Sequence, residues 1–203
     1  MPEPRARVRV AVLISGSGSN MAALIDAADR PGAPFEVVLV LSNKAEAGGL
    51  AVAGARGIAT AVVAHKAFGG DRAAHEQAVQ TVLDAHAVQV VALAGYMRLL
   101  TPFLVRRWAG RMLNIHPSLL PKYPGLDTHA RALAAGDAEA GCSVHLVAEG
   151  IDDGPLLGQS AVPIMADDTP ASLAQRVLAA EHRLYPAVLA DFCRDRLAGS
   201  QAR

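Results

Sequence analysis

The sequence has little cysteine and no excess of either charge. Its two cysteines, Cys142 and Cys193, lie far apart and outside any C-x-x-C pair, which argues against a disulfide framework and a thiolate metal site. Basic and acidic residues number 19 each, so the formal net charge is zero. A chain without net charge is a poor partner for nucleic acids or anionic membranes, and the composition excludes both as principal partners.

Long apolar runs are also missing. No stretch is long enough to cross a bilayer, and charged residues from Glu3 to Arg9 precede an apolar run at 10–14 that is too short for a signal peptide. The seven histidines do not show ligand spacing, so no metal is expected. Together with the scarce cysteines, these absences predict a cytoplasmic protein without a metal cofactor.

The chain is rich in apolar side chains. Hydrophobic residues make up 52% of the 203 residues and charged residues 19%, a balance that excludes wholesale disorder. A chain of this length buries enough surface for one sizeable core. We therefore expect a single domain over residues 1–203.

Short apolar runs alternate with helix-forming stretches along the first half. The runs are continuous rather than alternating with polar residues, which is typical of strands buried on both faces of a parallel sheet. This rhythm predicts an α/β fold with a doubly wound, mostly parallel sheet and helices on both faces. The expected strands are 8–14, 35–41, 61–63, 88–93 and 112–115, and the expected helices are 20–28, 47–56, 71–85 and 102–108.

The pattern changes in the second half of the chain. A proline-rich segment at 117–125 predicts a long loop, and two later strands, 142–147 and 157–162, are expected to be antiparallel or mixed. A threonine-proline start signal then predicts a long helix from Pro170 to about residue 192.

The first strand ends in a glycine-serine turn at 15–20 that leads into a helix. Glycines permit the tight turn, and the backbone N–H groups of a helix N-terminus attract an anion. The dinucleotide-binding fingerprint fails because Met21 stands in place of its third glycine, and no G-x-x-x-x-G-K motif is present. The turn therefore predicts a phosphomonoester site, to which Ser17, Ser19 and Asn20 add polar groups, with an ordinary capped turn as the alternative.

A later apolar strand ends with Asn114 and His116, which strand alternation places on the same face. A buried asparagine costs about 1–3 kcal/mol unless it is hydrogen-bonded, and its N–H is a suitable donor to an oxyanion. Histidine is the side chain best suited to proton transfer near neutral pH. The pair predicts a catalytic site, with a hydrogen-bonded core asparagine and a capping histidine as the alternative.

Acidic residues in a turn and in a helix are further candidates. Asp152 and Asp153 lie in a turn that is typically solvated, but an aspartate that reached His116 would favour its imidazolium form. The sequence does not show that these segments meet. Glu181 interrupts an apolar helical stripe, and a carboxylate on a buried face needs a partner. Glu181 is therefore a ligand-binding candidate, with an edge glutamate paired to an arginine as the alternative.

Six motifs resemble, in their order along the chain, those of the phosphoribosylglycinamide formyltransferases, a folate-dependent family of purine biosynthesis. The resemblance covers residues 8–197. The Asn-Ile-His-Pro-Ser-Leu-Leu-Pro run is specific for enzymes that use formyl-folate, and the glycine-serine turn narrows the resemblance to this family. The motifs are Ser-Gly-Ser-Gly-Ser-Asn at 15–20, Leu-Ser-Asn-Lys-Ala at 41–45, Leu-Ala-Gly-Tyr-Met-Arg at 93–98, Leu-Asn-Ile-His-Pro-Ser-Leu-Leu-Pro at 113–121, Ser-Val-His at 143–145 and Ile-Asp-Asp-Gly-Pro at 151–155.

The resemblance implies a Rossmann-like fold whose N-terminal half binds phosphate and whose C-terminal half binds folate and carries the catalytic residues. It implies transfer of the formyl group of the co-substrate 10-formyltetrahydrofolate to the amine of 5-phosphoribosylglycinamide, in the route to IMP. The implied partners are small molecules, and the oligomeric state stays open between monomer and homodimer.

The resemblance also implies residue roles. Asn114, His116 and Asp152 would be catalytic, since the spacing from Asn114 favours Asp152 over Asp153. Gly18, Ser19 and Asn20 would bind the substrate phosphate, and Glu181 the ribose. The folate would contact Arg72, Met97, Arg98, Leu99, Leu100, Asn114, Val147, Ala148, Glu149, Gly150, Ile151 and Asp152, with Arg72 aligning only after an inserted residue near Gly69.

Three other functions stay open from the sequence. A formyltetrahydrofolate hydrolase shares the Asn, His and Asp set, but relatives of that kind usually carry an N-terminal regulatory domain, whereas this sequence reaches its first strand at residue 8. A formyltransferase that acts on initiator tRNA would need a further C-terminal domain and positive charge. A non-catalytic phosphosugar-binding module would leave His116 and Asp152 unexplained.

Overall fold

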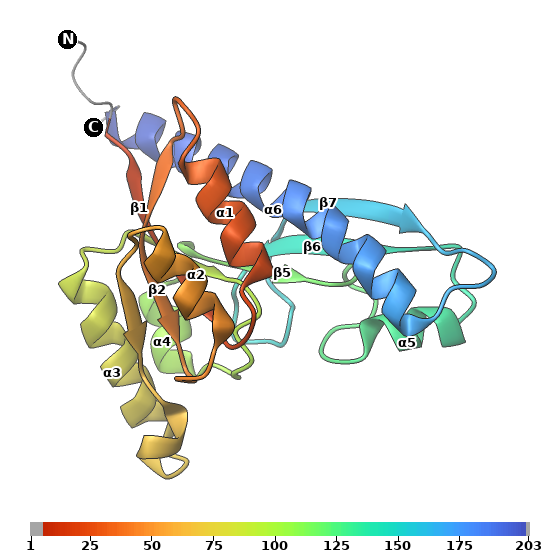
Figure 1. The fold of residues 1–203 in the computed structure, drawn as a ribbon, viewed down its shortest axis with the longest axis horizontal. Helices are drawn as coiled ribbons and strands as arrows, with labels where there is room; N and C mark the ends of the chain where they lie inside the picture. Colours follow the sequence, from red (N-terminus) through yellow and green to blue (C-terminus); the bar gives the residue numbers. More distant parts are fainter. Residues whose placement is uncertain (1–5, 202–203) are drawn as a thin grey trace.

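The computed structural model describes residues 6–201, the side chains of residues 200 and 201 excepted. Its centre is a seven-stranded sheet in the order β3-β2-β1-β4-β5-β6-β7 (Figure 1). Strands β1 to β5 are parallel, whereas β6 runs antiparallel to both of its neighbours. The strands are β1 (Val8–Ile14), β2 (Phe35–Ser42), β3 (Thr60–Val62), β4 (Val90–Leu93), β5 (Met112–His116), β6 (Glu139–Leu146) and β7 (Leu156–Pro163).

Helices cover both faces of this sheet, as the continuous apolar runs predict. Side chains of β1 alternate between two cores: Val10 and Val12 pack with α1 and α6, whereas Ala11 and Leu13 pack with α3 and α4. Figure 1 shows α6 running along the sheet past β6 and β7. The helices are α1 (Ser19–Ala28), α2 (Gly48–Ala55), α3 (Arg72–Ala85), α4 (Pro102–Arg107), α5 (Thr128–Ala134) and α6 (Pro170–Gln201), with a short 3₁₀ helix η1 (His65–Phe68).

The predicted α/β class and mostly parallel sheet are confirmed, but individual elements differ. Helix α5 has no counterpart in the sequence-based prediction, because it lacks a capping side chain and buries only Thr128 and Ala132. Helix α6 continues past residue 192, since Cys193 and Leu197 still pack on the core. Strand β6 begins at Glu139 rather than at residue 142, because its first residues pair with the end of β7.

The order of the strands reverses at β1. Strands β2 and β3 lie on one side of β1, and β4 and β5 on the other. In open α/β sheets, ligands bind beyond the carboxyl ends of the strands at such a reversal. The two loops that leave this point are joined directly, because the Ser15 N–H donates to the Gly95 carbonyl at 3.1 Å and the Met97 N–H donates to Ser15 Oγ at 2.8 Å.

Among residues 6–201, no helix combines the length and the apolar character that a membrane span requires.

One buried hydroxyl links helix α6 to the sheet by hydrogen bonds. The Tyr185 side chain is fully buried, and its hydroxyl lies 3.1 Å from the Leu93 carbonyl of β4 and 3.2 Å from the Leu113 carbonyl of β5. Removal of a buried donor leaves acceptors without a partner, which costs about 1–3 kcal/mol.

We expect Tyr185→Phe to lower the free energy of unfolding by about 1–3 kcal/mol in urea titrations. The matched control is Tyr96→Phe, because the Tyr96 hydroxyl forms no hydrogen bond with any described residue. That control is expected to change stability by less than about 0.5 kcal/mol. Equal effects of the two substitutions would contradict the role of the Tyr185 hydroxyl.

Candidate active site

The glycine-serine turn joins β1 to the N-terminus of α1. Gly18 has a φ of 75° and directly precedes the helix, which has no side-chain cap. The loop also packs tightly against the start of α2, because a Cβ on Gly49 would lie 2.6 Å from Ile14 Cδ1 and 3.1 Å from Gly18 Cα. The first N–H groups of α1 are therefore free of a protein cap and face a position where an anion is favoured.

Asn20 and Glu181 meet behind this turn. The Asn20 Nδ2 donates to Glu181 Oε2 at 2.6 Å, and both side chains are buried. Burial raises the pKa of Glu181, and the hydrogen bond from Asn20 lowers it only in part. Asn20 Oδ1 has no hydrogen-bond partner among the described residues. The polar partner that Glu181 required on its apolar stripe is thus Asn20 rather than an arginine.

Asn114 and His116 lie at the carboxyl end of β5, on one face, as strand alternation predicts. The antiparallel pairing with β6 sets His145 opposite Asn114 and Ser143 opposite His116. His145 Nε2 lies 3.2 Å from Asn114 Nδ2. The sequence analysis did not assign a role to His145, and its only signal was the Ser-Val-His motif, because the pairing of β5 with β6 is not visible in the sequence.

Asp152 reaches this strand end from the β6–β7 connection. Its Oδ2 lies 3.2 Å from His116 Nδ1, and its Oδ1 lies 3.4 Å from Asn114 Nδ2 and 3.5 Å from His145 Nε2. Asp153 is exposed, so the choice between the two neighbours falls on Asp152. Asp152 has a φ of 51°, a left-handed conformation that is uncommon outside glycine, asparagine and aspartate.

The surroundings of Asp152 favour its charged form. Burial by itself would raise the pKa of this carboxyl group, but the hydrogen bond to His145, the Gly125 N–H at 2.9 Å and the charge of His116 outweigh burial. The net effect lowers the pKa of Asp152 below its ordinary value. The group is therefore an anion at neutral pH, next to two imidazole rings.

His116 has an acceptor at each ring nitrogen. Nδ1 faces Asp152, and Nε2 lies 2.9 Å from the backbone carbonyl of Tyr123. The side chain is almost entirely buried. Only the imidazolium form has a hydrogen on both nitrogens, so it is the form that satisfies both acceptors at once.

The predicted folate residues form two neighbouring segments beside this cluster. Segment 97–100 follows β4, and segment 147–152 follows β6. Arg106 of α4, the helix that comes after segment 97–100, donates from Nε to Glu149 at 2.6 Å. Apolar side chains are unusually exposed here. The exposed fraction is 61% for Met97, 62% for Leu99 and 58% for Ile151, while Leu100, Val147 and Ala148 are half-buried and Gly150 is exposed.

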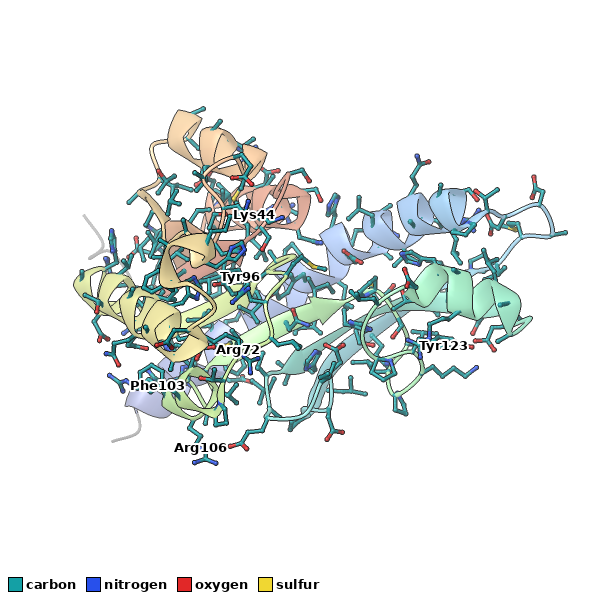
Figure 2. The ribbon with its side chains drawn as sticks, turned by 90° about the horizontal axis from the view of Figure 1, so that it is seen from below. Lys44, Arg72, Tyr96, Phe103, Arg106 and Tyr123 are labelled. Atoms are coloured by element: carbon teal, nitrogen blue, oxygen red, sulfur yellow. The ribbon has the colours of Figure 1, made fainter. Side chains whose placement is uncertain are left out.

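Two predicted folate residues carry positive charge. Arg98 is half-buried, and its charge acts on Tyr96 and on His75 of α3. Arg72 is the first residue of α3 and is exposed, with no hydrogen bond or ion pair to the other described site residues. Figure 2 shows Arg72, Tyr96, Phe103 and Arg106 together on one side, with Tyr123 beside α5 on the other.

A buried chain of polar side chains, not predicted from the sequence, joins the glycine-serine turn to segment 97–100. Ser15 Oγ donates to Asn43 Oδ1 at 2.5 Å and accepts from the Met97 N–H. Asn43 Nδ2 in turn lies 3.2 Å from His65 Nδ1. Asn43 belongs to the Leu-Ser-Asn-Lys-Ala motif, so these hydrogen bonds give that motif a structural role.

Within the described part of the chain, no group of three or more His, Cys, Asp or Glu side chains has an arrangement that could hold a metal ion.

The chain is similar to known formyltransferases. A family model described as formyl transferase matches residues 8–189. The chain is 47% identical over 190 residues to phosphoribosylglycinamide formyltransferase of Escherichia coli, covering 94% of this chain and 89% of that protein. It is also 47% identical over 183 residues to the trifunctional purine biosynthetic protein adenosine-3 of Bos taurus, of which it spans only 18%, with 90% of this chain covered.

Solved structures agree with these relatives. The crystal structure of phosphoribosylglycinamide formyltransferase from Brucella melitensis superposes with a TM-score of 0.89 at 56% identity, over 93% of this chain and 96% of that one. Glycinamide ribonucleotide transformylase 1 from Symbiobacterium toebii gives a TM-score of 0.92 at 40% identity, over 97% of this chain and 92% of that one. The chain belongs to the formyl transferase family.

Proposed function

We propose that the protein transfers the formyl group of 10-formyltetrahydrofolate to the amine of 5-phosphoribosylglycinamide, giving formylglycinamide ribonucleotide and tetrahydrofolate. The observation that carries this proposal is the convergence of two separate segments at one carboxylate: Asp152 lies 3.2 Å from His116 and 3.4 Å from Asn114. The names of the relatives point to the same substrate. We further propose that residues 1–203 form one formyltransferase domain.

The reaction is direct acyl transfer. The neutral amine of the ribonucleotide attacks the formyl carbon, and the carbonyl oxygen becomes an oxyanion. The Asn114 amide and the imidazolium of His116 are the groups that stabilise this negative charge, a contribution that is typically worth several kcal/mol. No side chain needs to be acylated, and burial raises the pKa of the Cys142 thiol to about 12, which makes it a poor nucleophile.

His116 also has the position for proton transfer. Its Nε2 is bound to the Tyr123 carbonyl, so in this proposal the proton that is transferred is the one on Nδ1, which His116 shares with the Asp152 carboxylate. From Nδ1 a proton passes to the folate nitrogen as it leaves, and Asp152 keeps the imidazolium oriented and charged. A water beside the Asp152 carboxylate would take the proton from the attacking amine and pass it to His116, which restores the imidazolium.

The two substrates approach from opposite directions in this proposal. The phosphate of the ribonucleotide binds the uncapped N-terminus of α1 at Gly18, Ser19 and Asn20. The ribose hydroxyls donate to Glu181, while the exposed apolar side chains of segments 97–100 and 147–152 cover the folate ring. The formyl group then meets the amine beside Asn114.

One assay distinguishes this function from the alternatives. The protein is incubated with 10-formyltetrahydrofolate, with and without 5-phosphoribosylglycinamide, and the folate products are followed. Turnover that strictly requires the ribonucleotide supports the transferase. Release of formate without the ribonucleotide would select the hydrolase, and no turnover with either substrate set would select a binding module; both results would overturn the proposal.

The catalytic cluster is tested by His116→Ala and Asp152→Asn. We expect each to lower kcat by about 10²–10⁴-fold, because each removes a proton-transfer or charge-stabilising group. Asparagine tolerates the left-handed backbone of position 152, so the protein is expected to fold. The matched control Asp153→Asn changes the exposed neighbour and is expected to stay close to wild type. Near-full activity in either test variant would remove that residue from the mechanism.

Glu181→Gln tests the ribose site and the buried carboxyl together. Because burial raises the folded-state pKa, the folded protein binds more protons than the unfolded chain between the ordinary and the raised value, and stability falls as pH rises through that window. Glutamine cannot ionise, so the variant is expected to lack this loss and to gain stability relative to wild type as the pH rises above the ordinary pKa of glutamate. Urea titrations measure this change, with the exposed Glu139→Gln as control.

The same variant also tests ribonucleotide binding. We expect the KM for the ribonucleotide to rise by about tenfold with a smaller change for the folate, because a charged acceptor of the ribose hydroxyls is lost. An unchanged KM for the ribonucleotide would contradict the ribose role, whatever the effect on stability.

A further inference from the structure

The catalytic cluster of Asn114, His116 and Asp152 contacts the backbone of a short loop, segment 122–125. Residues outside the site hold this loop in place. Within segment 122–125, the Tyr123 carbonyl accepts from His116 Nε2 at 2.9 Å, and the Gly125 N–H donates to Asp152 Oδ2 at 2.9 Å. One loop therefore touches both the imidazole and the carboxylate of the cluster. A shift of this loop would move both partners together.

Asp137 ties this loop to the α5–β6 turn. Its Oδ2 accepts from the Tyr123 hydroxyl at 2.8 Å, and its Oδ1 accepts from Lys122 Nζ at 2.8 Å. The side chain of Asp137 is 17% exposed, whereas that of Lys122 is 60% exposed. The hydroxyl bond from Tyr123 is thus the better shielded of the two and has the larger share in fixing the loop.

Arg131 of α5 completes the support. Its Nη1 donates to the Pro124 carbonyl at 2.7 Å, and its guanidinium lies 5.1 Å from the centre of the Tyr123 ring. The Tyr123 side chain is therefore held at its hydroxyl by Asp137 and at its face by Arg131. None of these three side chains contacts the catalytic cluster with its own functional group in the described structure.

We propose that Tyr123 and Asp137 are positioning residues of the active site: they hold segment 122–125 where its backbone fixes the ring of His116 and the carboxylate of Asp152. The proposal rests on the function proposed above. Its physical basis is that displacement of a catalytic group by about 1 Å lowers the rate of catalysis by up to about a hundredfold. The Tyr123 carbonyl also occupies Nε2 of His116, so that Nδ1, which faces Asp152, is the nitrogen used in the proposed proton transfer.

The charged and titratable groups around these residues are few. Asp152 faces His116 directly from the β6–β7 connection, and His145 of β6 lies behind that carboxylate. His129 of α5 is near enough for the charge of His116 to act on it. Around Tyr123, the charged neighbours are Asp137, Lys122 and Arg131.

The first measurement is kinetic and uses Tyr123→Phe and Asp137→Asn. We expect kcat to fall by about tenfold in each, with the KM for both substrates changed by less than about threefold, because the loop is a support for the catalytic groups rather than a substrate contact. The pH-rate profile is expected to shift in both variants, since the surroundings of His116 and Asp152 change. Unchanged kcat and pH profile in folded Tyr123→Phe would overturn the proposal.

The matched control is Asp168→Asn. Asp168 holds a similar network at the start of α6, where it accepts from Arg176 and from the Met165 N–H. This network does not touch the loop or the cluster, so we expect lower stability with kcat and the pH profile unchanged. If the control lowered kcat and shifted the profile as much as Tyr123→Phe does, the effect would be general destabilisation, and the proposal would fail.

A second measurement does not depend on activity. In ¹H–¹⁵N spectra of the imidazole groups, the Nε2–H of His116 is expected to exchange slowly with water in the wild type, because it is buried and bound to the Tyr123 carbonyl. The signal is assigned by its loss in His116→Gln. We expect faster exchange in Tyr123→Phe and no change in Asp168→Asn.

The two proposals fail in different ways. A wild-type protein without ribonucleotide-dependent turnover would end the proposed function, whereas the exchange of the His116 signal would still report on the loop. An equally slow exchange in wild type and Tyr123→Phe would end the positioning role, even if the transferase activity were present.

Discussion

The carboxylate of Asp152 joins the β6–β7 connection to the end of β5 and to the loop that follows β5. It accepts from Gly125, which lies 27 residues earlier, and from Asn114, which lies 38 residues earlier, and it faces the ring of His116. A buried anion needs several donors to be stable, and here the donors are the residues of the candidate site. The same hydrogen bonds therefore set the geometry of the site and stabilise the negative charge of Asp152.

The sheet explains why these donors are available. Five parallel strands end at one edge, and the order reverses at β1, so the turns after β1 and β4 lie side by side. The antiparallel pair of β6 and β7 then returns the chain to the end of β5 and delivers Asp152. Helix α6 closes the arrangement, because Glu181 contacts the turn after β1 and Tyr185 contacts the end of β4 and the beginning of β5.

Much of this was predictable from the sequence, for identifiable reasons. Continuous apolar runs revealed the buried strands, and a carboxylate on an apolar stripe revealed Glu181. Strand alternation also placed Asn114 and His116 on one face. What the sequence could not reveal were pairings between distant segments: His145 opposite Asn114, the Tyr123 carbonyl on His116, and the chain from Ser15 through Asn43 to Met97. Helix α5 was missed because only Thr128 and Ala132 mark its buried side.

The left-handed backbone at Asp152 has a consequence for how this position can vary. A φ of 51° disfavours β-branched and bulky residues on steric grounds, and admits glycine, asparagine and aspartate with least strain. Glycine has no side chain to reach the imidazole, and asparagine brings no charge. In a randomised library at position 152, each variant would have to fold with a left-handed backbone and also support turnover. Only aspartate meets both requirements.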